Sequence, residues 1–234
     1  MQYILAANQR RTLRQTLAQK DFRIGIRLTR LTFYSKFGFR WVIVTSIEYM
    51  LCLRRGHMKS QTLGTLLFDT DSECRKSTTV NVPALGNIEC TFTFPELDQD
   101  ADVFPDEFET AVRNFLMLPD GWLENCSPYL WEYYRDIIEL IGEEDVDPID
   151  ADDDILTKIE LDTEIEVRWD CDENDVYVSF GGSCDWEIEH GLQISLRDGS
   201  VLAKVGDFNG HVSNADAYDR EDFKNVVYVK RSML

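Results

Sequence analysis

Apolar and polar positions alternate along much of the chain after Met58, and this period of two predicts β-strands. The clearest case is IECTFTF at residues 88–94, where apolar residues take every second position and Glu or Thr takes the positions between them. PALGN at 83–87 supplies the turn before this strand. The predicted strands cover residues 63–68, 78–82, 88–94, 160–169, 176–180, 192–196, 201–205 and 226–230.

Two segments between these strands have a helical period instead. Residues 106–118 place Phe108, Val112 and Phe115 at helical spacing, and the PDG sequence at 119–121 ends that helix. The same kind of spacing predicts a second helix over residues 127–141. Strands combined with segregated helices are typical of an α+β fold, so we predict a largely antiparallel sheet with an inserted helical pair.

The dipeptide Asp198-Gly199 lies between two of the predicted strands. An Asp-Gly pair flanked by apolar alternation predicts a hairpin with a two-residue turn and positive φ at both turn residues. Glycine adopts that conformation freely and aspartate adopts it at moderate cost. Strands 192–196 and 201–205 are therefore expected to be antiparallel neighbours.

Charge divides the chain into two parts. Residues 1–57 carry eleven basic and two acidic residues, whereas residues 58–234 carry thirteen basic and 41 acidic residues, a formal charge of −28. Acids are densest in EEDVDPIDADDD at 143–154, which predicts a solvated loop. Such a charge attracts a basic protein partner and repels nucleic acid and anionic membranes.

The basic residues 1–57 show no clear period of either kind. They are typical of a transit peptide, a nucleic-acid-binding arm, a disordered tail or sequence that lies upstream of the true start codon. The last interpretation is favoured, because RRGHM at 54–58 can be encoded by a purine-rich ribosome-binding sequence followed by a start codon. We therefore predict a basic extension at 1–57, a start at Met58 and a single acidic domain at 58–234.

Cysteine usage and hydropathy bear on the compartment. The six cysteines form no CxxC pair, and the acidic part holds five of them, an odd number for a disulfide framework. This pattern predicts a reduced protein of the cytoplasm. The longest apolar run, Trp41–Leu53, has thirteen residues and is broken by Glu48, whereas a membrane helix needs about 20. No membrane partner is expected.

Two of the three histidines lie within residues 184–218, among acidic, aromatic and glycine residues. The EIEH sequence at 187–190 has the spacing of helical di-iron sites, but Gly191 and the alternation after it predict a strand here. One hypothesis is a mononuclear metal site in which His190 is joined across the hairpin by Asp207, His211 or Asp216. In the alternative, His190 and His211 only hydrogen-bond neighbouring strands and turns, and no cofactor is bound.

A cysteine nucleophile is a further possibility in the same stretch. Cys184 with His211 and Asp216 would form a Cys-His-Asp arrangement. The chain neighbours of Cys184 are acidic, and negative charge disfavours the thiolate, so the pKa of Cys184 is predicted to rise. Catalysis by this cysteine is not favoured.

The stretch CDWEIEHGLQISLRDG, followed by VGDFNGHVSNADAY, resembles the C-terminal signature CDWExEHGLQ…DGHxxNADAY of an uncharacterised bacterial family, a domain of unknown function. The resemblance covers Cys184–Tyr218. This chain departs from the pattern at Asn209, where the family has Asp, and at Ile188, where Pro is common. The resemblance implies no activity. The candidate functional residues are Trp186, Glu187, Glu189, His190, Asp207, His211, Asn214 and Asp216.

Two functions from different classes follow. The first is a small acidic cytoplasmic protein that binds a basic protein partner, as an immunity protein masks a toxin. Its main support is the segment 96–175, where 28 acidic residues accompany four basic ones. The second is a metal-dependent enzyme or sensor that uses His190 and His211. The sequence makes no prediction about the oligomeric state.

Overall fold

The computed structural model describes residues 58–97, 103–142, 148–150, 154–170 and 175–234. The predictions for the basic extension 1–57, and for most of the acidic loop 143–154, fall outside the described residues. Among the residues that are described, no helix is long and apolar enough to cross a membrane.

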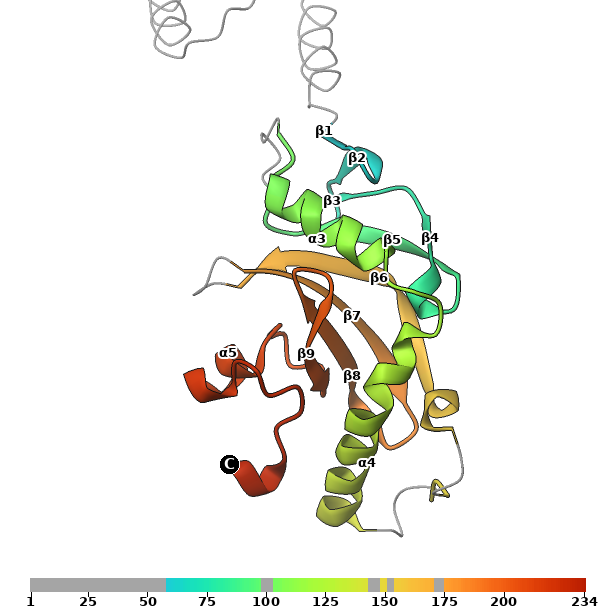
Figure 1. Cartoon of the computed structure of the whole chain (residues 1–234), viewed down its shortest axis with the longest axis vertical. Helices are drawn as coiled ribbons and strands as arrows, with labels where there is room; N and C mark the ends of the chain where they lie inside the picture. Colours follow the sequence, from blue (N-terminus) through green and yellow to red (C-terminus); the bar gives the residue numbers. More distant parts are fainter. Residues whose placement is uncertain (1–57, 98–102, 143–147, 151–153, 171–174) are drawn as a thin grey trace, which may run out of the picture. The chain divides into compact units, whose positions relative to one another are not determined.

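One large sheet organises the described part of the chain (Figure 1). Its order is β1-β2-β3-β5-β6-β7-β8-β9, and β4 pairs with β5 outside this path. Every pair is antiparallel except β5 with β6, which is parallel. The fold is therefore α+β with a largely antiparallel sheet. The strands are β1 Met58–Ser60, β2 Gly64–Asp69, β3 Cys74–Lys76, β4 Val80–Val82, β5 Ile88–Phe94, β6 Ile159–Trp169, β7 Val176–Cys184, β8 Glu187–Arg197 and β9 Val201–Gly206.

The two predicted helices are present in the connection between β5 and β6. Helix α3 spans Asp106–Leu116 and ends two residues before the predicted bound, whereas α4 spans Ser127–Ile141, as predicted. Gly121, with φ 78°, lies in the turn between them and precedes the short helix η2 at Trp122–Cys126. Parallel strands need a long crossover, and these helices provide it. The two helices pack on different strands of the sheet. Helix α3 packs on β6 and β7, whereas α4 packs on β9.

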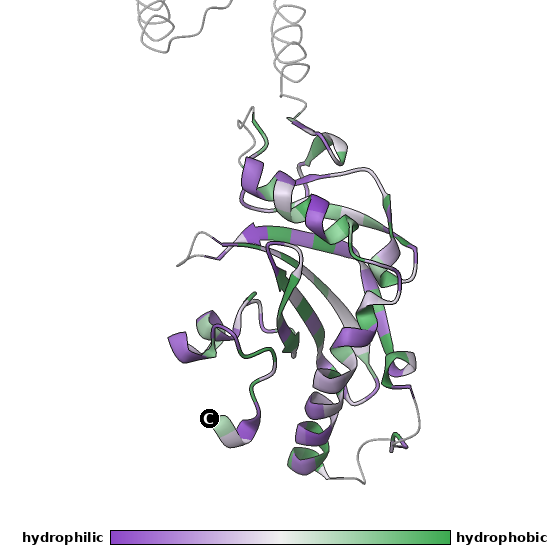
Figure 2. Ribbon diagram, viewed as in Figure 1, coloured by the Kyte–Doolittle hydropathy of each residue, from purple (hydrophilic) through white to green (hydrophobic). Residues whose placement is uncertain are grey.

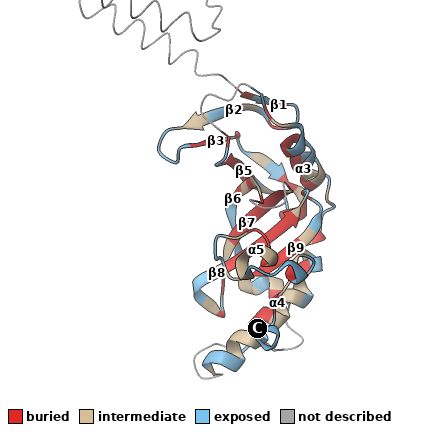
Figure 3. Ribbon diagram, turned by 90° about the vertical axis from the view of Figure 1, so that its left-hand side faces the viewer, coloured by how far each residue is buried: buried red, intermediate tan, exposed pale blue. Residues whose placement is uncertain are grey.

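The sheet face toward α3 carries the main hydrophobic core. Phe92 of β5 and Phe180 of β7 pack against Phe115 of α3, with ring centroids 6.2 and 5.9 Å away. Phe108, two turns earlier in α3, has its ring centroid 4.1 Å from that of Trp169. The central strands are the most buried part of the domain (Figure 3). Hydrophobic and hydrophilic residues are interspersed along α4 (Figure 2), and its buried residues are Leu130, Tyr133 and Tyr134.

The segment after β9 covers the opposite face of β7 to β9. It contains helix α5, Asn214–Tyr218, and the short helices η4, Glu221–Phe223, and η5, Arg231–Met233. Val212 from this segment forms a second, small apolar cluster with Tyr177 and Ala203 of the sheet. The remaining short helices are η1, Pro83–Leu85, and η3, Ile155–Lys158.

The predicted strand at 226–230 is wrong. These residues form no strand, and a single backbone bond, from Val205 N to Val227 O at 2.9 Å, joins them to β9. The side-chain amide of Asn214 donates to the carbonyls of Val226 and Val227, at 2.7 and 3.1 Å. Because only one backbone bond joins it to β9, the segment lies along the edge of β9 without extending the sheet.

The hairpin at Asp198-Gly199 has the predicted positive φ angles but not the predicted two-residue turn. The φ angles are 50° at Asp198 and 68° at Gly199, and Ser200 N donates to Arg197 O at 3.1 Å. The flanking pair is Arg197 with Val201, so three residues lie between the paired positions instead of the predicted two.

Candidate functional site

The start of β8 holds the EIEH sequence in an extended but irregular conformation. Glu187 Oε1 accepts hydrogen bonds from the backbone N–H groups of Glu189 and His190, at 2.9 and 3.2 Å. It also lies 3.6 Å from His190 Nδ1. Residue 188 is 90% exposed while Trp186 is 2% exposed, so these two side chains do not share a buried face as strict alternation would require. The prediction of a strand in place of a helix is confirmed.

Trp186 lies in the turn between β7 and β8 and belongs to the core. Its ring meets Tyr133 and Tyr134 of α4 edge-on, at centroid distances of 5.9 and 6.0 Å. The indole Nε1 has no hydrogen-bond partner among the described residues. Trp186 therefore fixes the position of α4 behind the site and does not face solvent.

His211 forms a separate pair with Asp216. His211 Nδ1 lies 2.7 Å from Asp216 Oδ2. Asp216 is in the first turn of α5, and its backbone N–H is capped by Ser213 Oγ at 3.2 Å. Each histidine thus has its own carboxylate. Across the described parts of the chain, no group of three or more His, Cys, Asp or Glu side chains has the arrangement of a metal site.

Cys184 is buried at the end of β7, next to the turn that contains Trp186. Burial raises the pKa of this thiol to about 11, and the charges of Glu187 and Asp185 add to the shift, while backbone hydrogen bonds partly oppose it. The predicted direction of the shift is confirmed, although burial is its largest cause and the acidic neighbours are secondary. A thiol of this kind is a poor nucleophile near neutral pH.

Lys204 of β9 is a central residue of this region that sequence reasoning missed. It is 1% exposed. Its ammonium donates to Gln193 Oε1 at 2.8 Å, to His211 O at 3.0 Å and to Asn209 Oδ1. Burial lowers the pKa of Lys204 to about 8, and the charges of Asp207 and Asp216 oppose part of that shift. Neutral acceptors therefore hold a buried cation and join β9 to the loop at 207–211.

The polar network continues from Lys204 into the sheet. Gln193 of β8 donates to Ser179 Oγ of β7 at 3.0 Å, and Ser195 Oγ lies 2.9 Å from the same oxygen. All of these side chains are buried. In the sequence, a lone lysine in an apolar strand gives little sign that it will be enclosed, because its burial depends on the segment that covers the strand.

A cavity of about 190 Å³ lies on one side of this network. Four of the eight candidate residues line it, together with three tyrosines that sequence reasoning did not select. Tyr218 belongs to the NADAY end of the sequence signature, so the resemblance could have indicated it. The lining residues are Tyr133, Asp136, Ile137, Glu187, His190, Lys204, Val205, Gly206, Asp207, Asn214, Tyr218, Tyr228, Val229, Arg231 and Leu234.

A groove of about 310 Å³ lies on the other side of the network. Asp162, Glu164 and Glu166 of β6 form one wall, and Phe208 belongs to the loop that forms the other. A Cβ on Gly181, in the floor, would stand 2.8 Å from Asp162 Oδ2 and 3.4 Å from the Phe208 ring. The absence of a side chain at position 181 therefore lets a carboxylate and an aromatic ring lie close together over the strand.

A family model described as "Domain of unknown function (DUF6985)" matches residues 62–212. The match covers more than half of the chain, so the chain belongs to this family. It includes the strands from β2 to β9, the groove residues and Lys204, and it ends before α5. Neither the curated proteins nor the solved structures include a match to the chain.

Proposed function

We propose that this member of the DUF6985 family is a protein-binding module, and that the groove beside β6 receives a basic segment of its partner. The observation that carries the proposal is the combination in one groove of the carboxylates Asp162, Glu164 and Glu166 with the exposed ring of Phe208. Carboxylates and an aromatic ring together suit lysine and arginine side chains.

The charges around the groove support a cationic partner. Glu166 is paired with Arg168 at 3.2 Å, and Glu164 with Lys76 at 3.4 Å. The carboxylate of Asp162 has no hydrogen-bond or ion-pair partner among the described residues. The groove therefore keeps an excess of negative charge, and residues 58–234 add a long-range field of the same sign. Such a field speeds the encounter with a basic protein at low ionic strength.

Phe208 supplies the apolar component that charge alone lacks. Phe208 is 52% exposed, whereas large aromatic residues elsewhere in the described domain are mostly buried. Interfaces obtain much of their affinity from a few aromatic or arginine residues, and the surrounding charges contribute mainly orientation and association rate. A basic side chain placed between Asp162 and Phe208 would gain both kinds of interaction.

We extend the proposal to the biological setting that the sequence suggests. The protein would act in the bacterial cytoplasm as an immunity-type protein that masks a basic toxin. This extension rests on analogy with small acidic immunity proteins and on the charge of the domain.

The test uses a fluorescent nine-residue peptide of alternating arginine and glycine as a probe. The groove variant carries Asp162→Asn, Glu164→Gln and Glu166→Gln. A matched control removes three exposed charges elsewhere, through Glu107→Gln, Asp120→Asn and Glu139→Gln. Affinity measured at one ionic strength should fall roughly tenfold in the groove variant and less than about twofold in the control. Equal losses in both variants, or no binding to the native protein, would overturn the proposal.

A further inference from the structure

Three acidic side chains line the cavity beside Lys204, and one of them, Asp207, has no hydrogen-bond or ion-pair partner among the described residues. Asp136 accepts hydrogen bonds from Tyr228 OH at 3.0 Å and from Arg231 N at 2.9 Å. Glu187 accepts the two backbone bonds at the start of β8. The carboxylate of Asp207 lines the same cavity and has no hydrogen bond or ion pair with any described residue. A ligand that donates hydrogen bonds or carries positive charge would satisfy it.

Lys204 lies near Asp207 but does not form an ion pair with it. The three N–H bonds of the ammonium are taken by Gln193, Asn209 and the carbonyl of His211. Lys204 therefore reduces the negative potential of the cavity without forming an ion pair with the carboxylate of Asp207. A further cation can reach Asp207 without displacing any of the hydrogen bonds of Lys204.

Aromatic residues line the same cavity as this carboxylate. Tyr133, Tyr218 and Tyr228 all line the cavity. Burial raises the pKa of each of the three phenols, and the charge of Asp207 adds to the shift in every case. The Tyr133 and Tyr228 rings lie 5.9 Å apart. Phenol rings attract cations through the negative potential of their faces, and a nearby carboxylate strengthens this attraction.

The size of the cavity limits what can bind. Its volume of about 190 Å³ exceeds the roughly 150 Å³ that holds one benzene molecule in an engineered protein cavity. A group of several heavy atoms fits, whereas an extended peptide does not.

We propose that this cavity is a binding site for a small organic cation, an alkylammonium or guanidinium group, with Asp207 as its counter-charge and the three tyrosine rings around it. The cation has two possible sources, a free amine or the tip of a lysine or arginine side chain of a protein partner. Only the second source rests on the proposed function. The loop after β9 would then separate the two sites, with Asp207 facing the cavity and Phe208 facing the groove.

The first test compares choline with 3,3-dimethylbutan-1-ol, which has the same shape but a carbon atom in place of the charged nitrogen. Calorimetric titration of the native protein should give at least tenfold tighter binding for choline or for agmatine than for the neutral alcohol. Because this comparison uses unchanged protein, it does not depend on the folding of any variant. Equal binding of choline and the alcohol, or no binding of either cation, would overturn the proposal.

The second test uses variants. Asp207→Asn should weaken binding of the cation at least tenfold. Asp219→Asn removes an equal charge at the C-terminal end of α5 and should leave binding unchanged. Equal weakening by both variants would show a general charge effect and would overturn the site.

The arginine-glycine peptide distinguishes the two sources. If a partner side chain occupies the cavity, agmatine should compete with the peptide, and Asp207→Asn should weaken peptide binding. If a free amine is the ligand, Asp207→Asn should weaken only the binding of the small cations. Loss of peptide binding in the groove variant with cation binding intact would support the cavity site independently of the proposed function.

Discussion

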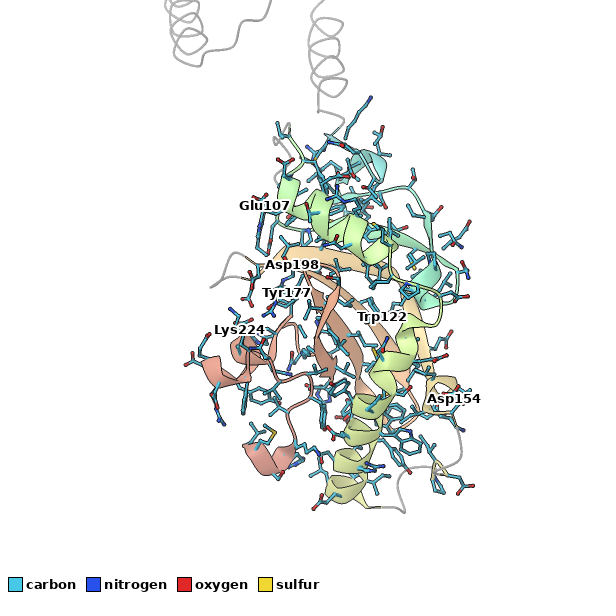
Figure 4. The ribbon with its side chains drawn as sticks, in the orientation of Figure 1. Glu107, Trp122, Asp154, Tyr177, Asp198 and Lys224 are labelled. Atoms are coloured by element: carbon cyan, nitrogen blue, oxygen red, sulfur yellow. The ribbon has the colours of Figure 1, made fainter. Side chains whose placement is uncertain are left out.

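Gly199, at the tip of the β8–β9 hairpin, lies against the backbone of Ala111 in α3. A Cβ at position 199 would overlap the carbonyl oxygen of Ala111 and would stand 2.8 Å from its carbonyl carbon. Beside this contact, Asn114 Nδ2 donates to Asp198 O at 2.9 Å. Figure 4 shows Asp198 next to α3. The hairpin is therefore held to the helix by main-chain contact, which only glycine permits at this point.

Replacing Gly199 with alanine should destabilise the domain by about 2–4 kcal/mol. Part of the loss comes from the positive φ of 68°, which is unfavourable for residues with a Cβ. The rest comes from the collision with α3, since overpacking typically costs about 1–3 kcal/mol. Urea unfolding measures the change. Gly86→Ala is the matched control, because Gly86 has φ 78° and nothing within 4 Å of its Cβ position. A loss at Gly199 no larger than the loss at Gly86 would contradict the close contact with α3.

Glu109 of α3 holds the turn between β1 and β2. Its carboxylate accepts hydrogen bonds from Ser60 Oγ at 2.8 Å, from Gln61 N at 3.0 Å and from Thr62 N at 2.8 Å. Burial acts to raise the pKa of Glu109, but these hydrogen bonds and one from the Thr62 hydroxyl outweigh burial, so the pKa is lowered. Glu109→Gln should lower the free energy of unfolding by about 1–3 kcal/mol, because an amide cannot accept the same set of bonds.

The lowered pKa of Glu109 also predicts a pH dependence. The folded state keeps this carboxylate ionised at pH values where the unfolded chain is already protonated, below the ordinary value of 4.5. The contribution of Glu109 is therefore complete above pH 4.5 and is lost as pH falls through the folded pKa. The difference in stability between native protein and Glu109→Gln should shrink as the pH falls below 4.5. A constant difference over this range would argue against the carboxylate as the cause.

At high pH, buried thiols and phenols should destabilise the fold. Burial raises the pKa of Cys126 to about 12, that of Cys184 to about 11, and also those of Tyr133 and Tyr228. In the unfolded chain, thiols ionise near 9.0 and phenols near 10.0, so the unfolded state releases protons that the folded state retains. The free energy of unfolding should fall as pH rises from about 9 to 11. Urea unfolding at constant ionic strength measures this profile, and a flat profile would contradict it.

Lys204 should act in the opposite direction in the same pH range. Its folded pKa of about 8 lies below the ordinary value of 10.5, so the folded state loses this proton first and gains relative stability between those values. Lys204→Met should make the decline at high pH steeper than in the native protein.

At neutral pH, Lys204→Met should also lower stability by about 1–3 kcal/mol, because Gln193, Asn209 and His211 lose their donor. Lys59→Met, at an exposed position of β1, is the control. A Lys204 variant as stable as the Lys59 variant would mean that the three hydrogen bonds contribute nothing net.

The sequence was sufficient to predict those elements whose conformation depends on neighbouring residues in the chain. The period of two at 88–94 and the helical period at 127–141 match β5 and α4 residue for residue. Asp198-Gly199 adopts the predicted positive φ angles. These features depend on neighbouring residues in the chain, because periodicity records which side of an element is buried and turn residues restrict their own φ.

Tertiary structure decided what the local pattern could not. The parallel pairing of β5 with β6 brings Phe92 beside Ile165, which is far along the chain. The segment 226–230 has the composition of a strand, yet it makes only one backbone bond to β9, and the amide of Asn214 binds two of its carbonyls. The burial of Lys204 and the tyrosine-lined cavity arise only when the C-terminal segment covers the sheet. Each of these features depends on contacts between residues that are distant in the sequence. The free energy of such contacts exceeds the local conformational preference of the segment, and the contacts produce no periodic pattern in the sequence.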